Sequence, residues 1–145
     1  MADMQAVTPL VPEEAVPYVG EALRILRKEV GNQSTLLGFV GAPFTLASYV
    51  VEGGGSKTFQ VIKGLAFSQP QVLHALLDKF ADSIITYIKY QADNGAQAVQ
   101  IFESWGCNLT PTDFDIFSLP YLKKIISTVK ARTWWGGAIK MGGGV

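Results

Sequence analysis

Apolar residues recur at helical spacing over two long stretches of the chain. The first covers residues 17–30; it begins with a proline, which suits a first helical turn, and Gly31 favours its end. The second is the longest, opened by Pro70 and ended by the pair Asn94 and Gly95. Its apolar face consists of Leu73, Leu76, Leu77, Phe80, Ile84, Tyr87 and Ile88. Each stretch predicts an amphipathic helix with one face on a core.

Two short segments have a different pattern. Residues 35–40 and 98–102 are mostly apolar runs bounded by polar residues or glycine, which is typical of strands buried on both faces in a parallel sheet. Between them, Pro43 opens a further helix that the glycines 53–55 end, and another helical segment covers 57–66. Strands and helices therefore alternate along this part of the chain.

Two further helix starts come after the second strand, at Thr110 before Pro111 and at Ser118 before Pro120. Residues 1–12 predict an irregular lead-in. The crossovers between strands are long and no hairpin turn separates them, so the fold class is α/β with a parallel sheet. Two strands cannot form a stable sheet of this kind, because both faces and both edges need cover. We therefore expect the chain to be a piece of something larger.

Composition narrows the function classes. The 145 residues are 48% hydrophobic and 17% charged, which excludes a disordered chain. With 12 basic and 12 acidic residues the chain has no net charge, so neither nucleic acid nor an anionic membrane surface is an expected partner. No apolar run approaches the roughly 18 residues of a membrane span. One Cys and one His cannot build a structural zinc site, and no cluster of carboxylates suggests another metal.

Candidate chemistry is expected after the two strands, because the loops at the carboxyl ends of parallel strands form the sites of α/β proteins. Tyr49, in the helix behind the first strand, is either a ligand-binding hydroxyl or a core aromatic. Ser104, just past the second strand, either donates a hydrogen bond to a ligand or caps a local turn. Glu103 is either a general base or a partner of another site residue.

Other polar features favour structural interpretations. The Gly53–Gly55 loop follows a helix and lacks the Lys-Ser/Thr of a P-loop, so a helix stop is favoured over a phosphate cradle. His74 lies on the flank of the longest helix, which favours a solvated side chain. Cys107 has no charged neighbour in sequence that would activate its thiol.

At the two strand ends the residues become specific enough to compare with a known family. Residues 38–56 read GFVGAPFTLASYVVEGGGS, and residues 97–105 read QAVQIFESW. Both closely resemble signatures of the uroporphyrinogen decarboxylase family, and the stretch 113–122 resembles the next segment of that family. The resemblance covers residues 4–132. The sequence of residues 90–97, YQADNGAQ, is similar to that of the plant and algal plastid branch of the family.

The resemblance implies a (β/α)8 TIM barrel enzyme of haem and chlorophyll synthesis. Such an enzyme removes the four acetate carboxyl groups of uroporphyrinogen III to give coproporphyrinogen III, without a metal or an organic cofactor. Tyr49 and Ser104 match residues that hydrogen-bond the tetrapyrrole substrate, and Phe39 matches one that lines the cleft beside the macrocycle. The resemblance also implies a plastid stroma location, with the cytoplasm as the alternative, and a homodimer in the full-length family.

The departures from the family lead to further expectations. The Arg and Asp residues that the family uses on its substrate, and its late His, have no matching position here. Residues 1–132 are expected to form a partial barrel, since about 250 residues are needed to close one. Residues 133–145 form a Gly- and Trp-rich tail outside the family pattern. We therefore expect an inactive fragment.

Two alternatives remain open. One is a non-catalytic product that pairs with full-length subunits through surface left uncovered. The other is a related barrel methyltransferase, although such enzymes usually use a His/Cys zinc site that one His and one Cys far apart do not suggest.

Overall fold

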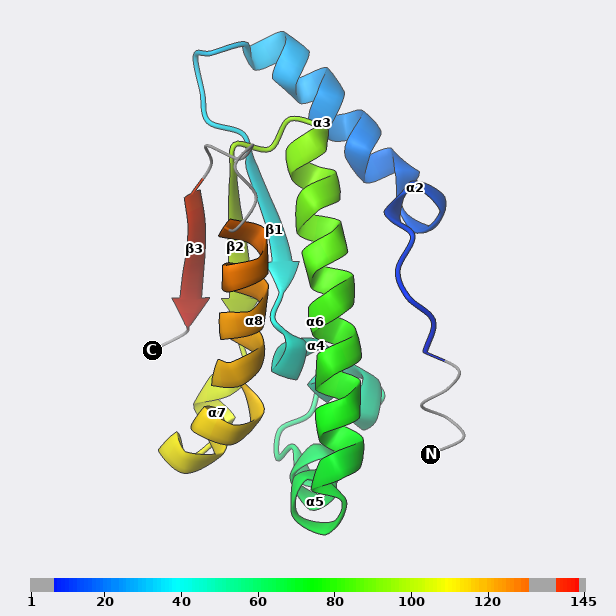
Figure 1. The fold of residues 1–145 in the computed structure, drawn as a ribbon, viewed down its shortest axis with the longest axis vertical. Coiled ribbons are helices and arrows are strands. Elements are labelled where there is room, and N and C mark those ends of the chain that lie inside the picture. Colours follow the sequence, from blue (N-terminus) through cyan, green and yellow to red (C-terminus); the bar gives the residue numbers. More distant parts are fainter. Residues whose placement is uncertain (1–6, 131–137, 144–145) are drawn as a thin grey trace.

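The computed structural model describes residues 7–130 and the backbone of residues 138–143. Three parallel strands are covered by helices on one face, where the helices Pro70–Asp93 and Leu119–Lys130 run beside the strands (Figure 1). In chain order the elements are α2 (Pro12–Ala15), α3 (Pro17–Val30), β1 (Leu37–Gly41), α4 (Pro43–Glu52), α5 (Gln60–Ser68), α6 (Pro70–Asp93), β2 (Ala98–Glu103), the 3-10 turn η1 (Gly106–Asn108), α7 (Pro111–Phe117), α8 (Leu119–Lys130) and β3 (Ala138–Gly143).

The sheet has the strand order β1-β2-β3, and both pairs are parallel. Leu37 lies opposite Ala98 and Gly41 opposite Phe102, so the carboxyl ends of β1 and β2 are level. The α/β class and the two predicted strands are thereby confirmed. The third strand, β3, pairs with β2 along its whole length and was not predicted from the hydrophobic pattern. The Trp pair of the tail lies outside the described residues.

Burial alternates along β1, and this corrects the prediction that β1 is buried on both faces; in β2 the consecutive residues Val99, Gln100 and Ile101 are all buried. Gly38 and Val40 face the helices, and Val40 is 8% exposed. Leu37 and Phe39 face the other way and are 54% and 65% exposed. Within the described residues, helices cover one face of the sheet only, so the apolar residues of the second face have no cover.

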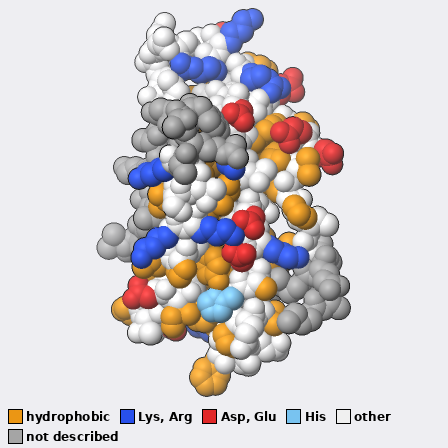
Figure 2. Space-filling view, in the orientation of Figure 1, with side chains coloured by type: hydrophobic (Ala, Val, Ile, Leu, Met, Phe, Trp, Pro, Cys, Tyr) orange, Lys and Arg blue, Asp and Glu red, His pale blue; other side chains and the backbone are white. Residues whose placement is uncertain are grey.

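The core lies between the sheet and helices α6 and α8. Ile88 of α6, Val99 of β2 and Ile125 of α8 are completely buried there. The amphipathic pattern predicted for residues 70–93 is confirmed: its apolar face supplies most of the buried side chains of α6. On the outward side of the helices, basic and acidic side chains are interspersed (Figure 2), as expected for a chain without net charge.

The helix boundaries in the structure differ from the predicted ones by small shifts. Thr110 caps α7 as predicted, because its hydroxyl oxygen accepts a hydrogen bond from the Asp113 amide at 3.1 Å. The helix predicted over 57–66 begins later, at Gln60. There the Glu52 carboxylate accepts a hydrogen bond from the Ile62 amide at 2.9 Å, a cap that comes from α4 and not from the neighbouring sequence.

The lead-in predicted over residues 1–12 has no regular structure over residues 7–11, and a short helix, α2, begins at its last residue, Pro12. Over residues 7–130 and 138–143, no helix is long and apolar enough to cross a bilayer.

Candidate functional site

The sequence-predicted site residues gather at one end of the sheet. All three strands point their carboxyl ends toward the end of the molecule where α4, α5 and α7 lie (Figure 1). The loop after β1 leads directly into α4, which carries Tyr49, and the loop after β2 carries Ser104. Parallel pairing with level strand ends therefore brings these two segments together, although 55 residues separate Tyr49 from Ser104 in the sequence.

Two aromatic side chains form an apolar wall on the uncovered face of the sheet. Phe39 of β1 is 65% exposed and Phe102 of β2 is 44% exposed. Their rings meet edge to face, with centroids 6.4 Å apart. Phe39 is thus exposed in this structure and is not a core side chain. A flat apolar ligand could lie against this wall.

Tyr49 lies on α4, the helix that directly follows β1. It is 43% exposed, and its ring meets the indole of Trp105 edge to face at 5.8 Å between centroids. The structure gives its hydroxyl no hydrogen-bond partner among the described residues. The simple core-aromatic alternative therefore does not describe Tyr49, because a core tyrosine would be buried with its hydroxyl satisfied.

Ser104 comes directly after β2 and is exposed. Its side-chain hydroxyl makes no hydrogen bond to another residue in the described part of the chain, so the turn-capping alternative finds no support there. Its carbonyl oxygen lies 3.7 Å from the thiol of Cys107, which is exposed and unpaired in this loop. Tyr49 and Ser104 thus offer two uncommitted hydroxyl groups at the same end of the sheet.

Glu103 points away from the exposed face, into the helix layer, and is 8% exposed. Its two carboxylate oxygens accept hydrogen bonds from Thr45 Oγ1 at 2.6 Å and from Ser118 Oγ at 2.7 Å. Burial raises the pKa of the Glu103 carboxyl, and the two hydroxyl donors oppose that shift. In this orientation Glu103 cannot act as a general base on a ligand at the exposed face. The orientation fits the alternative, in which Glu103 is a partner of another site residue.

The Gly53–Gly55 loop ends α4 as predicted. Gly53 adopts a left-handed conformation with φ of 74°, and Gly54 donates a backbone hydrogen bond to the Tyr49 carbonyl at 3.0 Å. This left-handed cap explains the need for glycine at the end of the helix that bears Tyr49.

His74 corrects a prediction, because it is not a freely solvated side chain. It is half-buried between α6 and the α7–α8 segment, where its Nδ1 lies 2.6 Å from the Tyr121 hydroxyl. Its ring stacks on Phe117, with centroids 5.0 Å apart. The residue therefore belongs to the helix packing. The pattern missed this contact because α7 and α8 come more than 35 residues later in the chain.

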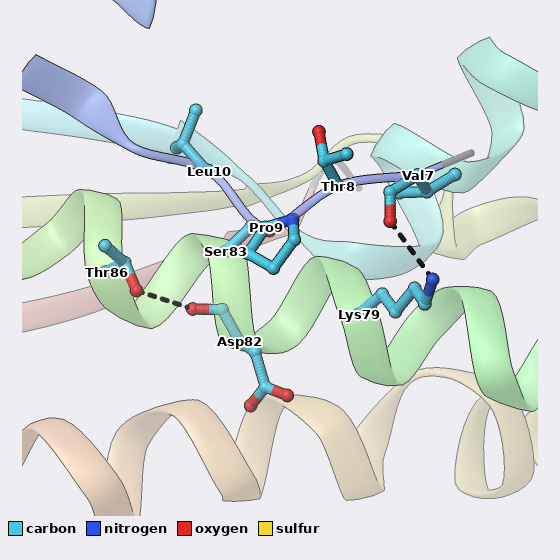
Figure 3. Close-up of a pocket in the computed structure, with 8 residues that line it drawn as sticks. All are labelled: Val7, Thr8, Pro9, Leu10, Lys79, Asp82, Ser83 and Thr86. Atoms are coloured by element: carbon cyan, nitrogen blue, oxygen red, sulfur yellow. Dashed lines mark hydrogen bonds between the residues drawn. The ribbon is translucent and has the colours of Figure 1, made fainter. Parts of the chain in front are cut away.

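Cavities lie beside β1 and α6. One, of about 320 Å³, lies at the outer edge of β1 and is lined by Phe39, Gly41, Tyr87 and Leu10 among others. The other, of about 160 Å³, lies where residues 7–10 cross α6 (Figure 3).

In the second cavity Lys79 donates to the Val7 carbonyl at 3.0 Å. Asp82 lines this cavity and forms an ion pair with Lys124 of α8 at 2.7 Å. Leu10 belongs to both cavities.

Metal-binding groups of three or more His, Cys, Asp or Glu side chains are not found among residues 7–130. Sequence reasoning missed three residues that complete the site: Phe102, Trp105 and Thr45. Phe102 could have been identified from the sequence, because strand alternation places it on the same face as Phe39 once the parallel register is known. Thr45 and Trp105 meet only in the folded chain.

Comparison with known proteins identifies relatives over most of the chain. The family model described as "Uroporphyrinogen decarboxylase (URO-D)" matches residues 1–139. Over 129 residues the chain is 69% identical to uroporphyrinogen decarboxylase 2, chloroplastic, of Arabidopsis thaliana and 68% identical to the chloroplastic uroporphyrinogen decarboxylase of Nicotiana tabacum. These alignments cover 89% of this chain and 33% of each relative. The chain therefore spans about a third of the length of these curated relatives.

More distant similarities extend beyond plants. The uroporphyrinogen decarboxylase of the cyanobacterium Microcystis aeruginosa is 57% identical over 129 residues, which are 37% of that protein. Among solved structures, a methyltransferase from Methanosarcina mazei superposes with a TM-score of 0.74 at 22% identity, covering 94% of this chain and 41% of that one. At this identity the structural match indicates a shared fold only.

Proposed function

The chain belongs to the uroporphyrinogen decarboxylase family, and we propose that it carries part of the substrate site of an enzyme that converts uroporphyrinogen III to coproporphyrinogen III. The observation that supports this proposal is the pairing of an exposed aromatic wall with two free hydroxyl groups. Phe39 and Phe102 offer an apolar surface to a macrocycle, and Tyr49 and Ser104 offer hydrogen-bond donors to its carboxylates.

The reaction needs positioning more than it needs reactive side chains. A protonated pyrrole carbon makes the ring an electron sink, so the electron pair left by each departing carboxyl group flows into the ring as carbon dioxide leaves. The exocyclic carbon then takes up a proton and the ring carbon loses the proton it had gained, which restores the pyrrole and leaves a methyl group. The protein must hold each acetate arm in register with that ring. In the proposed site Tyr49 and Ser104 bind carboxylates while the aromatic wall orients the macrocycle. This chemistry requires no cofactor.

The proposal concerns binding by this chain and not turnover. The family resemblance assigns the remaining substrate contacts to Arg and Asp residues that have no matching position in this sequence. Among the described residues that line the cavity at the edge of β1, none is basic. We therefore expect the purified chain to bind uroporphyrinogen without decarboxylating it.

The fold and location belong to the same proposal. Strands β1 and β2 would be consecutive strands of a (β/α)8 barrel, and the uncovered sheet face would be its interior. The family-like part would end near residue 132. The plastid stroma is the proposed location, because the Arabidopsis and tobacco relatives are named chloroplastic.

Anaerobic equilibrium dialysis against uroporphyrinogen III tests the proposed site. We expect the wild-type chain to bind it, and Tyr49→Phe and Ser104→Ala each to weaken binding about tenfold through loss of one hydrogen bond to a charged group. Tyr18→Phe and Ser127→Ala, at exposed positions on α3 and α8, are the matched controls. Equal affinity of all five chains, or no binding by the wild type, would reject the proposal.

A second function, pairing with longer family members or with a second copy, is favoured by the exposure of Leu37 and Phe39 on the uncovered sheet face. Size-exclusion chromatography of the chain alone and with the tobacco enzyme tests it. A stable complex that Phe39→Ser abolishes would support this function, and elution of two separate monomers would reject it.

A further inference from the structure

Glu103 lies between the two segments that carry the proposed substrate hydroxyls, and its side chain contacts both. We propose that Glu103 is a positioning residue: its buried carboxylate fixes Tyr49 and Ser104 relative to each other. The inference rests on the proposed function, since it concerns the geometry of that site.

Strand geometry separates the task of Glu103 from that of its neighbours. Successive side chains of a strand point to opposite faces. Phe102 is 44% exposed on the uncovered face, Glu103 is 8% exposed in the helix layer, and Ser104 is exposed again. Glu103 therefore cannot contact a ligand at the exposed face, but any movement of its backbone moves Phe102 and Ser104 directly.

The first link from Glu103 runs to α4. The Thr45 hydroxyl donates to the Glu103 carboxylate at 2.6 Å, and Thr45 is 4% exposed. Tyr49 lies four residues later on the same helix, which places it on the same helical face one turn further along. The hydrogen bond thus fixes the rotation of the helix that presents Tyr49.

The second link runs through the loop that bears Ser104. The Trp105 amide donates to Thr45 Oγ1 at 3.3 Å, so the same hydroxyl contacts both Glu103 and the loop. The loop then folds closely around the carboxylate. A Cβ added to Gly106 would lie 2.7 Å from Glu103 Cγ, which is too close for any other residue without a shift. Trp105 in turn contacts the ring of Tyr49.

A third link holds the carboxylate from the opposite side. Ser118, at the junction of α7 and α8, is 1% exposed and donates to the second oxygen of Glu103 at 2.7 Å. No Lys or Arg of the described chain forms an ion pair with Glu103. The carboxylate is held by hydroxyl donors and so acts as a double acceptor between α4 and the α7–α8 junction.

Three variants separate positioning from simple stability. Glu103→Ala removes both acceptors. Glu103→Gln keeps the shape and one acceptor, and one of the two hydroxyls can rotate to accept from the new amide. Thr45→Val removes the hydroxyl that joins α4 to Glu103 and to the Trp105 amide, and it leaves the Glu103 charge and the Ser118 hydrogen bond in place. Thr86→Val is its matched control, because Thr86 is an exposed threonine of α6 whose hydroxyl bonds only within its own helix.

The experiment measures site geometry and binding on the folded chains. Nuclear Overhauser contacts between the Tyr49 and Trp105 rings report the geometry, and dialysis reports the affinity for uroporphyrinogen III. We expect Thr45→Val and Glu103→Ala to lose the ring contacts and to bind about tenfold more weakly. Glu103→Gln should retain the contacts and most of the affinity, and Thr86→Val should match the wild type.

The outcomes distinguish this inference from the proposed function. Wild-type ring contacts and wild-type affinity in both Thr45→Val and Glu103→Ala would overturn the positioning role. If Glu103→Ala does not fold, Thr45→Val and its control decide the question. If the wild type binds no uroporphyrinogen, the proposed function fails, and the ring contacts alone then support or reject the positioning role of Glu103.

Discussion

The side-chain amide of Gln91 makes two hydrogen bonds with the backbone of Phe39. Its Oε1 accepts from the Phe39 amide at 3.0 Å and its Nε2 donates to the Phe39 carbonyl at 3.2 Å. These backbone groups lie on the edge of β1 away from β2, because Gly38 and Val40 supply the ladder to β2. A helix side chain thus replaces a neighbouring strand at this position. Gly38 allows it, since a Cβ there would lie 2.4 Å from Gln91 Oε1.

Gln91→Leu should therefore destabilise the chain by about 1–3 kcal/mol, because it leaves partly buried backbone groups of Phe39 without partners. Urea denaturation measures this loss, and Gln71→Leu at an exposed position of α6 is the control. Faster amide exchange at Phe39 should accompany the loss. Unchanged exchange in Gln91→Leu would show that the two bonds do not protect this strand edge.

The raised pKa of Glu103 predicts a pH-dependent stability. In the folded chain burial favours the protonated carboxyl, so the folded state binds more protons than the unfolded state between the ordinary and the raised pKa. The wild type should therefore lose stability relative to Glu103→Gln as the pH rises from acid toward neutral. Urea denaturation of both chains at several pH values tests the sign. If the stability of the wild type instead increased relative to that of Glu103→Gln with rising pH, the predicted sign would be wrong.

Two glycines should respond to alanine in opposite directions. Gly95 has φ of 114°, and a Cβ there would lie 3.1 Å from Arg27 Cβ, so Gly95→Ala should cost about 1–3 kcal/mol. Gly64 lies inside α5 with open space around it, so Gly64→Ala should stabilise by about 0.5–1 kcal/mol. Thermal unfolding should give a lower Tm than the wild type for Gly95→Ala and a higher Tm for Gly64→Ala. A shift of both Tm values in the same direction would be inconsistent with these backbone conformations.

Burial in the core should decide how much a side chain of the helix layer contributes to stability. Leu77 of α6 is completely buried, and Leu77→Ala should destabilise by about 2–5 kcal/mol. Phe67 of α5 is 94% exposed, and Phe67→Ala should change the free energy of unfolding by less than about 0.5 kcal/mol. Chemical denaturation of both variants measures the difference. Similar losses would mean that Phe67 packs against something in solution.

The helices were predictable because their signals are local. Prolines at the first turns of α3, α4, α6 and α7, and a glycine after α3 and α4, lie next to the periodic apolar positions that they bound. The boundary of α5 was less accurate because Glu52, outside the helix, caps it. The strand β3 was missed because the glycine-rich sequence of 138–143 lacks the apolar run on which a strand prediction depends.

The candidate site was predictable in part for the same reason. Strand ends are local features, so Tyr49 and Ser104 could be placed near one another by the rule for parallel sheets. The role of Glu103 could not be ranked from sequence, because Thr45 and Ser118 contact it from segments 58 and 15 residues away. The burial of His74 against Tyr121 depends on a contact across 47 residues, and His74 was wrongly predicted as solvated.

An anaerobic NMR titration of the labelled chain with uroporphyrinogen III tests most directly whether the chain carries part of a uroporphyrinogen site. We expect shift changes to concentrate at Phe39, Phe102, Tyr49 and Ser104, toward the carboxyl ends of the strands. Gln97, beside the amino end of β2, should stay unchanged. Shift changes centred at the opposite end of the strands, or none at a saturating concentration, would contradict the proposed site.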